Sequence, residues 1–423
     1  MKKTLLALSI PYLLSAHTMP ELFDALKHHS QTKSDEILVK KAEISASQAT
    51  SQLYPTINLF GTYDNYSDPT NMLPLAPNRI KPMLVDTTIA QPYSYNIYKA
   101  GANFSMPIFV KALYTMADKA EAMQKSAKAK KRINLLKNEA LIVGTNANLL
   151  YLDALKQSLN LKEKSLLETQ KTLKVKVDNG RAPASALYKI NDNLNQINIS
   201  KNNIDLQNKK LVSSIEAITG IKLTKAVAMQ EIHNITKNDF ASLKPLREKV
   251  KASRLGVNAE KEKLYPTLVA HGSYAYSTAT AYNNKKDINE KYGNIGLLLN
   301  IPLLSMNQYD TVTKSKLELQ ADEIELEKLR DELAAKADML ESSLPLLDNS
   351  IKLSQQSILN KQKLLEIAKV NYKSTRLSTE EYLRYEDDVI DAKAKLYQAK
   401  AQKWQTLMEL AVIYANNIEE MLK

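Results

Sequence analysis

The sequence predicts a mainly helical protein with a small amount of β-strand, built as two copies of one unit. Three observations lead to this fold class. Glycine accounts for only 9 of 423 residues, whereas sheet-rich enzymes with many tight turns and phosphate-binding loops need far more. Apolar residues recur every seven positions over long stretches, as they do in coiled coils. Short segments in which apolar and polar residues alternate interrupt these stretches, and alternation is typical of strands.

The first residues have the pattern of a secretory signal. Lys2 and Lys3 precede an apolar run from Thr4 to Ala16, which is too short to span a bilayer but suits the core of a signal peptide. We therefore expect residues 1–16 to direct export, with a buried N-terminal helix as the alternative. The chain contains no cysteine, which excludes disulfides, thiolate metal sites and cysteine nucleophiles.

The net charge of +12 has a simple explanation in the distribution of the basic residues. They are scattered among Glu and Asp along the predicted helices, and no compact Lys/Arg cluster contains interleaved aromatic residues. This pattern is typical of solvated helix faces rather than of a nucleic-acid-binding surface. The sequence therefore predicts no nucleic-acid partner.

An internal repeat organises the chain. The segment Leu53–Thr56, with the sequence Leu-Tyr-Pro-Thr, recurs further along the chain as Leu264–Thr267. A second, slightly shorter offset links three further pairs: Met106–Ile108 with Ile301–Leu303, Arg181 with Arg376, and Ile218 with Ile413. Because these matches occur in order and in register, we infer that one unit has been duplicated.

Each repeat is expected to run helix, strand, strand, long helix, turn, helix, with prolines marking several of the boundaries. We place the first repeat at 17–220, a linker at 221–240 and the second repeat at 241–423. The helices expected in the first repeat cover 21–53, 108–177 and 183–219, and its strands cover 57–68 and 97–107. The helices expected in the second repeat cover 241–264, 303–373 and 378–415, and its strands cover 267–277 and 292–301.

Apolar ladders predict how the helices pack. Four of them have seven-residue spacing: Leu152, Leu159, Leu166 and Leu173; Ile190, Ile197, Ile204, Leu211 and Ile218; Leu326, Leu333, Leu340 and Leu347; and Val389, Leu396 and Leu410. Only a supercoil keeps such a stripe facing its partner, so the pattern predicts a long antiparallel coiled coil. Pro345 lies inside the second long helix, where we expect it to kink the helix or remove one hydrogen bond.

The four strand candidates have one apolar and one polar face. Along 97–106, for example, Ala102 and Phe104 alternate with Asn103 and Ser105, and tyrosines lie in or beside all four segments. Segments of this length and period suit strands that cross a bilayer, with tyrosines at the interface; ordinary strand propensity of tyrosine is the alternative. Four strands cannot close a barrel in lipid, so several chains would have to contribute.

Taken together, these motifs resemble the TolC family of outer-membrane efflux channels over nearly the whole chain. The resemblance rests on the duplicated unit, the two Leu-Tyr-Pro-Thr segments, Met-Pro-Ile-Phe at 106–109, Ile-Pro-Leu-Leu at 301–304 and the two hairpin turns described below. It implies a homotrimer in the outer membrane of a Gram-negative cell. Twelve strands, four per chain, would form a transmembrane β-barrel in the lipid, continued by a helical barrel in the periplasm.

The function implied by the resemblance is passive conduction in a tripartite efflux or type I secretion system. A periplasmic adaptor and an inner-membrane transporter are the implied partners. The adaptor would dock at the two hairpin tips, which comprise Asn179, Gly180, Arg181, Ser374, Thr375 and Arg376. The periplasmic entrance would be gated by ionic contacts of Arg376 and Glu380, with Glu381 as a further charge.

One part of the entrance departs from the family pattern. Leu383 stands where a second acidic residue is expected, with Arg384 beside it. The acidic run 386–388 would supply charge at the entrance instead, or would form a solvated helix face. The sequence leaves both interpretations open.

Two other classes of function can be compared with the channel. A periplasmic coiled-coil scaffold without a pore explains the heptads but leaves the four strand candidates unused. An enzyme is not expected, because the five histidines form no His-Glu-x-x-His motif and neither a Walker-type loop nor a dinucleotide-binding fingerprint occurs. We therefore predict no catalytic residue, metal site or cofactor.

Overall fold

The computed structural model describes residues 17–230, 234–374 and 376–422. The expected signal at 1–16 and the tip residue Thr375 lie outside the described residues. The chain forms two compact units, and each unit contains segments of both sequence repeats. Among the described residues, the helical unit contains those within 17–38, 128–245 and 327–422, and the sheet unit contains Val39–Ala127 and Leu246–Leu326.

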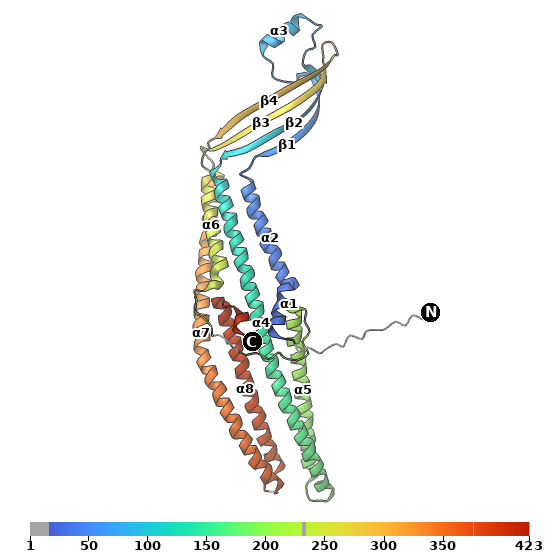
Figure 1. The fold of residues 1–423 in the computed structure, drawn as a ribbon, viewed down its shortest axis with the longest axis vertical. Coiled ribbons are helices and arrows are strands. Elements are labelled where there is room, and N and C mark those ends of the chain that lie inside the picture. Colours follow the sequence, from blue (N-terminus) through green and yellow to red (C-terminus); the bar gives the residue numbers. More distant parts are fainter. Residues whose placement is uncertain (1–16, 231–233, 375, 423) are drawn as a thin grey trace, which may run out of the picture. The chain divides into compact units, whose positions relative to one another are not determined.

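The sheet unit contains four antiparallel strands in the order β1-β2-β3-β4 (Figure 1). Their bounds are Thr56–Asn71 for β1, Tyr93–Phe109 for β2, Thr267–Thr280 for β3 and Asp287–Asn300 for β4. All four extend beyond the predicted ranges at the end where the β1–β2 and β3–β4 connections lie. The backbone ladder continues there although the apolar alternation stops, and the edge strand β1 tolerates Pro69 beside a register shift.

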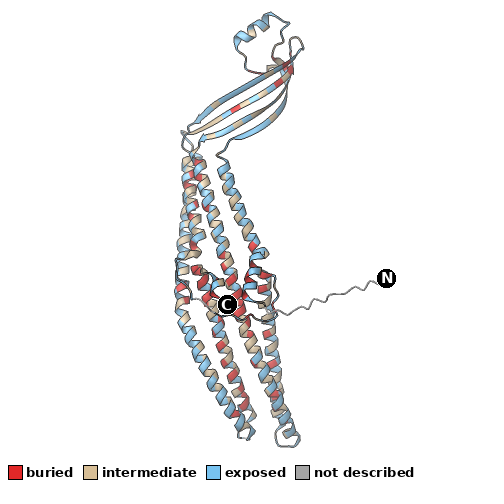
Figure 2. Cartoon of the chain, viewed as in Figure 1, coloured by how far each residue is buried: buried red, intermediate tan, exposed pale blue. Residues whose placement is uncertain are grey.

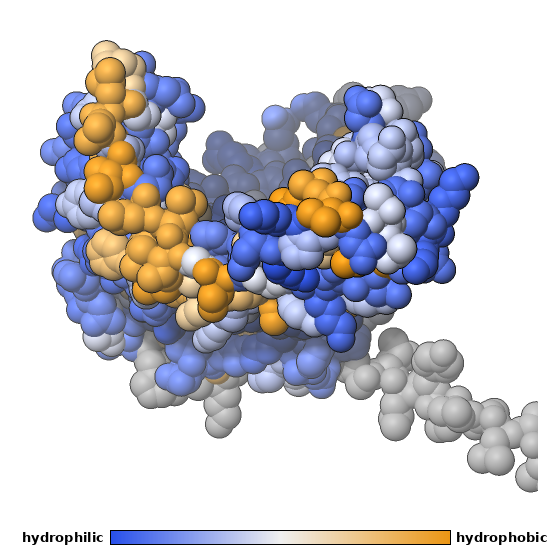
Figure 3. Space-filling model, turned by 90° about the horizontal axis from the view of Figure 1, so that it is seen from above, coloured by the Kyte–Doolittle hydropathy of each residue, from blue (hydrophilic) through white to orange (hydrophobic). Residues whose placement is uncertain are grey.

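The strand register gives the sheet one apolar and one polar face. One rung across the four strands consists of Leu59, Ala102, Tyr274 and Gly293. The neighbouring rung consists of Asn58, Asn103, Ser273 and Asn294. Because neighbouring rungs point to opposite faces, the first set belongs to an apolar face and the second to a polar face. No described part of the chain covers the apolar face, and Leu59 is 85% exposed. Figure 3 shows hydrophobic surface gathered in bands beside hydrophilic surface.

Four strand glycines each stand opposite an aromatic ring of the neighbouring strand. The pairs are Phe60 with Gly101, Phe104 with Gly272, Tyr274 with Gly293 and His271 with Gly296. Each ring lies over its glycine, so that an added Cβ would come within about 3 Å of it. Glycine is therefore required here by close packing of rings on the sheet rather than by a turn.

Helices make up most of the described chain outside the sheet. Their bounds are Met19–His28 for α1, Ser30–Ser51 for α2, Pro77–Val85 for α3, Lys111–Asp178 for α4, Ala184–Thr219 for α5, Lys244–Glu262 for α6, Met306–Lys373 for α7, Thr379–Tyr414 for α8 and Ile418–Met421 for α9, with a 3₁₀ turn, η1, at Ala241–Leu243. The long helices α4 and α7 have 68 residues each, and their partners α5 and α8 have 36 residues each. The two repeats therefore build hairpins of equal length. No helix in the described ranges combines the length and apolarity needed to cross a bilayer.

Three local expectations were wrong. The predicted helix 21–53 is divided at His29, which is extended, and Thr32 Oγ1 donates a 2.7 Å hydrogen bond to the Leu26 carbonyl at the end of α1. The predicted helix 241–264 begins instead with the 3₁₀ turn η1, and the helix predicted from 303 begins at Met306. The expectation at Pro345 is not among these: α7 continues through Pro345 as one helix, and one hydrogen bond is lost there because proline has no N–H group.

The predicted apolar ladders form the seams of the helical unit. Leu166, Leu173, Ile190 and Ile197 are buried in one cluster between the helices. A second and larger cluster packs the apolar face of α1 against α4, α5 and α8. Buried residues therefore gather along the inward stripes of these helices, whereas their outer faces are exposed (Figure 2).

Replacing Gly101 with alanine should destabilise the sheet unit. The new Cβ would lie 2.3 Å from the Tyr274 carbonyl oxygen and 2.9 Å from the Ala275 Cα, and backbone atoms cannot rotate away. We expect a loss of about 1–3 kcal/mol in the free energy of unfolding. Gly61→Ala is the matched control, because its nearest neighbour is the Lys99 oxygen at 4.0 Å. Denaturant unfolding compares the two variants, and equal stability would contradict the packing argument.

Glu139 of α4 should make the stability of the helical unit depend on pH. Its side chain is 3% exposed, and burial, together with the charge of Glu419, raises its pKa to about 7, while Lys27 opposes the shift. The folded state thus favours the neutral acid, whose stabilising contribution is complete below pH 4.5 and is lost as pH rises through 7.

The test is the variant Glu139→Gln, which keeps the shape of the neutral side chain. Relative to the wild type, it should gain on the order of 3 kcal/mol of stability near pH 8 and little near pH 4. Denaturant unfolding of both proteins across this range measures the difference. A difference that does not vary with pH would show that Glu139 does not titrate in the folded protein.

Candidate functional site

The first hairpin, α4–α5, turns at one of the predicted tips. The amide of Arg181 donates to the Lys176 carbonyl at 2.7 Å, and the amide of Gly180 donates to the Val177 carbonyl at 2.9 Å. Gly180 has φ +66°, the left-handed conformation that ends many helices and favours glycine. Asn179 caps the turn through its side chain, which donates to the Val175 carbonyl.

The second hairpin, α7–α8, repeats this turn in its backbone. The amide of Arg376 donates to the Asn371 carbonyl at 2.9 Å, the counterpart of the Arg181 bond in the first repeat. Ser374 Oγ donates to the carbonyls of Val370 and Asn371. The two predicted tips therefore share this backbone hydrogen bond, although their sequences differ.

The carboxylates predicted for the entrance have different partners. Glu380 forms an ion pair with Lys189 of α5 at 2.8 Å, so its partner is a lysine of the first hairpin and not an arginine. This contact lowers the pKa of Glu380. Glu381 instead closes a capping box with Ser378, whose hydrogen bonds lower the pKa of Glu381. Arg376 is exposed at the turn.

The acidic run 386–388 connects helices, with Glu386 buried, Asp388 half-buried and Asp387 exposed. Glu386 is buried and accepts hydrogen bonds from Ser165 of α4 and from the Tyr382 hydroxyl, the latter at 2.8 Å. Burial raises the pKa of Glu386. Asp387 pairs with Lys162 of α4, and Asp388 pairs with Lys361 of α7 at 3.2 Å.

An apolar cluster surrounds these polar contacts. Tyr382 stacks on Tyr372 with ring centroids 4.9 Å apart, and both rings belong to the cluster formed by the helix seams near the tips. Leu383, which stands where the family pattern has an acidic residue, is buried in the same cluster. An apolar residue is needed at this position because the side chain points into the seam between the helices.

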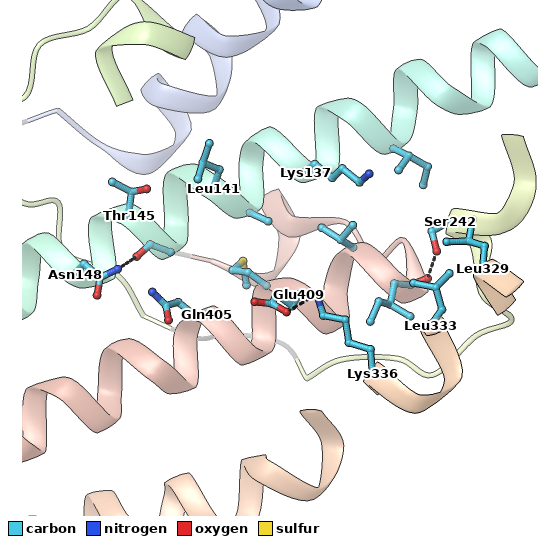
Figure 4. Close-up of a pocket in the computed structure, with 16 residues that line it drawn as sticks. Lys137, Leu141, Thr145, Asn148, Ser242, Leu329, Leu333, Lys336, Gln405 and Glu409 are labelled. Atoms are coloured by element: carbon cyan, nitrogen blue, oxygen red, sulfur yellow. Dashed lines mark hydrogen bonds and ion pairs between the residues drawn. The ribbon is translucent and has the colours of Figure 1, made fainter. Parts of the chain in front are cut away.

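A cavity of about 710 Å³ lies elsewhere in the helical unit, between α4, α7 and α8 (Figure 4). Its lining is largely apolar, and several of its polar groups are already paired. Lys336 forms an ion pair with Glu409 at 2.8 Å, and Ser242 donates to the Ile413 carbonyl at 3.2 Å. This arrangement resembles a packing gap rather than a catalytic site. In the described part of the chain, no three acidic or histidine side chains are placed to hold a metal ion.

The candidate functional site therefore consists of the two tips and of the contacts that join the hairpins. Sequence reasoning found Glu380 but missed Lys189, Lys162 and Ser165. Those three residues belong to the first hairpin, far from their partners in sequence, and a periodic pattern on one helix does not reveal which residues of another helix oppose it. The sequence contained one signal of these partners: the first turns of α8 are rich in acidic residues. Acidic side chains that become buried or paired need hydrogen-bond donors or cations on a neighbouring helix.

Neither a protein-family model nor the sequence of a curated protein matches the chain. Solved structures do match. The CmeC outer membrane channel of Campylobacter jejuni has 16% identity and a TM-score of 0.77, covering 95% of this chain and 88% of CmeC. VceC from Vibrio cholerae has 16% identity and a TM-score of 0.75, covering 94% of this chain and 95% of VceC.

A third match is the MtrE outer membrane channel of Neisseria gonorrhoeae in its open state. It has 12% identity and a TM-score of 0.75, covering 95% of this chain and 89% of MtrE. The chain has the fold of these outer-membrane channels. This result confirms the fold implied by the resemblance to the TolC family.

Two lysines of the first hairpin provide a matched test of the contacts in this channel fold. The side chain of Lys162 is 10% exposed, whereas that of Lys189 is 67% exposed, and each pairs with a carboxylate of α8. Lys162→Met should cost about 1.5–3 kcal/mol of stability, because the ammonium group that bonds the carboxylate is itself largely shielded from water, although Asp387 is half-exposed. Lys189→Met should cost far less, since water screens an exposed pair. Urea unfolding measures both variants, and a larger loss at Lys189 would contradict this ranking.

Proposed function

We propose that this chain is the outer-membrane channel of a tripartite efflux or type I secretion system and acts as a homotrimer. The observation that carries the proposal is the sheet, which has one apolar and one polar face, and whose apolar side is left uncovered by every segment that the structure describes. A sheet of this kind suits a wall between lipid and water. The channel fold shared with CmeC and VceC supports the same role.

The open edges of the sheet support association of several chains. Within one chain, β1 and β4 each pair with a strand on one side only, and lipid offers no partner for unpaired backbone groups. Pairing of β1 with β4 of the next chain would satisfy both edges. Three copies would give a barrel of twelve strands, the arrangement that the family resemblance implies.

The helices offer a second argument for association. α7 carries a further apolar stripe that the sequence analysis did not identify, with every member more than half exposed. It consists of Met339, Leu346, Leu353 and Ile367. These positions are seven or fourteen residues apart, which is the spacing of a coiled-coil seam. An exposed seam of this kind is suited to a helix of a neighbouring chain.

In this proposal the protein is a passive conduit in the outer membrane, with its helices in the periplasm. An inner-membrane transporter would supply the energy, and a periplasmic adaptor would contact the tips around Gly180 and Arg376. The ion pair of Lys189 with Glu380 and the contacts of Glu386 would hold the second hairpin against the first in the closed state. Opening would separate these contacts.

A periplasmic scaffold without a pore is the competing function. It leaves the exposed apolar face of the sheet without a role. Heat-resistant trimers extracted from outer membranes with detergent, with ion conductance in planar bilayers, are the result expected for the channel. A detergent-independent, water-soluble monomer or dimer without conductance is the result expected for the scaffold. Drug susceptibility and secreted proteins of a deletion strain then distinguish efflux from secretion.

Adjacent residues on β1 test the orientation of the sheet in lipid. Leu59→Lys places a charge on the apolar face and should cost up to about 2–4 kcal/mol, depending on its depth in the membrane. Asn58→Lys places the same charge on the polar face and should be tolerated. The amount of folded trimer in outer membranes measures both variants. Equal loss for the two variants would contradict the proposed faces.

A charge exchange tests the role of the tip contact. Lys189→Glu opposes Glu380 with a like charge and should raise the open probability in planar bilayers about two- to five-fold, a modest effect because the pair is exposed. The double variant with Lys189→Glu and Glu380→Lys should return to wild-type gating. Failure of the exchange to restore gating, with trimers intact, would remove this pair from the gate.

A further inference from the structure

The connection between β1 and β2 covers part of the polar face of the sheet. Met72 and Leu73 of this connection are buried against Ile97, Ala279 and Ile288. Ile97, Ala279 and Ile288 form one rung of the sheet. Because Ile97 lies six residues before Asn103 on β2, and side chains alternate between the faces of a strand, both belong to the polar face. The connection therefore packs on the side proposed to face the pore.

Hydrogen bonds fix this connection to the turn between β3 and β4. Asn283 accepts from the Gln91 amide at 3.0 Å and donates to the Ile89 carbonyl at 2.8 Å. Asn284 and Lys286 both donate to the Thr88 carbonyl, at 3.0 and 3.3 Å. The segment is thus held at several points to a neighbouring hairpin, as a fixed part of the wall rather than a free loop.

The anchored connection carries α3, which presents apolar side chains to solvent. Leu84 is 66% exposed and Val85 is 83% exposed. A cavity of about 470 Å³ separates the helix from Tyr93 and Tyr282 at the strand ends. Leu84 lines this cavity, whereas Val85 is turned almost fully to solvent. The connection that carries both residues packs, through Met72 and Leu73, on the side of the sheet proposed to face the pore.

The diameter of a twelve-stranded barrel determines how strongly three copies of α3 would narrow it. Strands about 4.8 Å apart and tilted by about 40° close into a barrel with a backbone diameter of about 24 Å. A helix with its side chains is about 10 Å across. Three connections that each project a helix from the inner wall would therefore leave only a narrow opening.

We infer that α3 of each chain narrows the mouth of the channel distant from the helices, with Leu84 and Val85 forming an apolar rim that limits ion flow. The inference rests on the proposed trimeric pore. Apolar constrictions hinder hydrated ions more than their diameter alone would, because water is held poorly between apolar walls. Solutes with apolar surface would pass such a rim at a smaller cost than ions. The rim would thus contribute to selectivity at the end of the barrel where the β1–β2 and β3–β4 connections lie.

Single cysteines test the rim, because the chain has no cysteine of its own. Val85→Cys, labelled in the trimer with a bulky maleimide, should reduce single-channel conductance at least about two-fold. Asn58→Cys is the control, since it lies on the same polar face but on the wide part of the wall. Measurements in the Lys189→Glu background as well ensure that a closed tip does not mask the effect.

Cross-linking gives a second readout that does not depend on gating. A short bis-maleimide should join Val85→Cys residues of different chains, whereas Asn58→Cys residues across the wide wall should not be joined. Leu84→Cys repeats the test if Val85→Cys assembles poorly. The rim would be contradicted if conducting trimers with cysteine at position 84 or 85 showed neither a change in conductance nor cross-links. It would also be contradicted if Asn58→Cys showed effects of the same size. Absence of trimers or of conductance in the unlabelled wild type would instead overturn the proposed channel.

Discussion

The seven-residue seam between the long helices is the constraint on which the other features depend. Residues such as Leu166 and Ile190 must face a partner helix at every second turn, and this requirement fixes the register of α4 against α5 and of α7 against α8. Once the register is set, each polar side chain beside the seam lies opposite a particular residue of the neighbouring helix. Leu166 of α4 packs in the same cluster as Tyr382 and Leu383 of α8, and beside this cluster Lys162 pairs with Asp387 and Ser165 bonds Glu386.

Much of the fold could be predicted because it is periodic. The heptads located the long helices, and the repeated Leu-Tyr-Pro-Thr segment located the starts of β1 and β3 at Thr56 and Thr267. The prediction failed where structure depends on single contacts. The break at His29 is accompanied by one side-chain hydrogen bond from Thr32, and α3 lies in a connection whose packing comes from residues distant in the sequence, such as Asn283.

The candidate site was predictable in position but not in chemistry. The constant offset between the two repeats identified both tips, and Arg376 forms the same backbone bond as Arg181. The ionic partners were not recoverable, because the sequence of α8 does not reveal that Lys189 of α5 lies opposite Glu380. Likewise, an acidic run in a helix resembles a solvated face until the donors on the neighbouring helix are known.

The matched lengths of the helices restrict how such a protein can change in evolution. Removing one heptad from α4 alone would shorten it by about 10 Å and carry its tip out of reach of the α7–α8 hairpin. A compensating deletion in α5 would repair the first hairpin but leave Lys162 and Lys189 without their partners. Length can therefore change only through coordinated, whole-heptad insertions or deletions in all four helices. Two repeats whose helices must change length together cannot be resized gradually, so the length of the helical hairpins changes only in steps of one heptad.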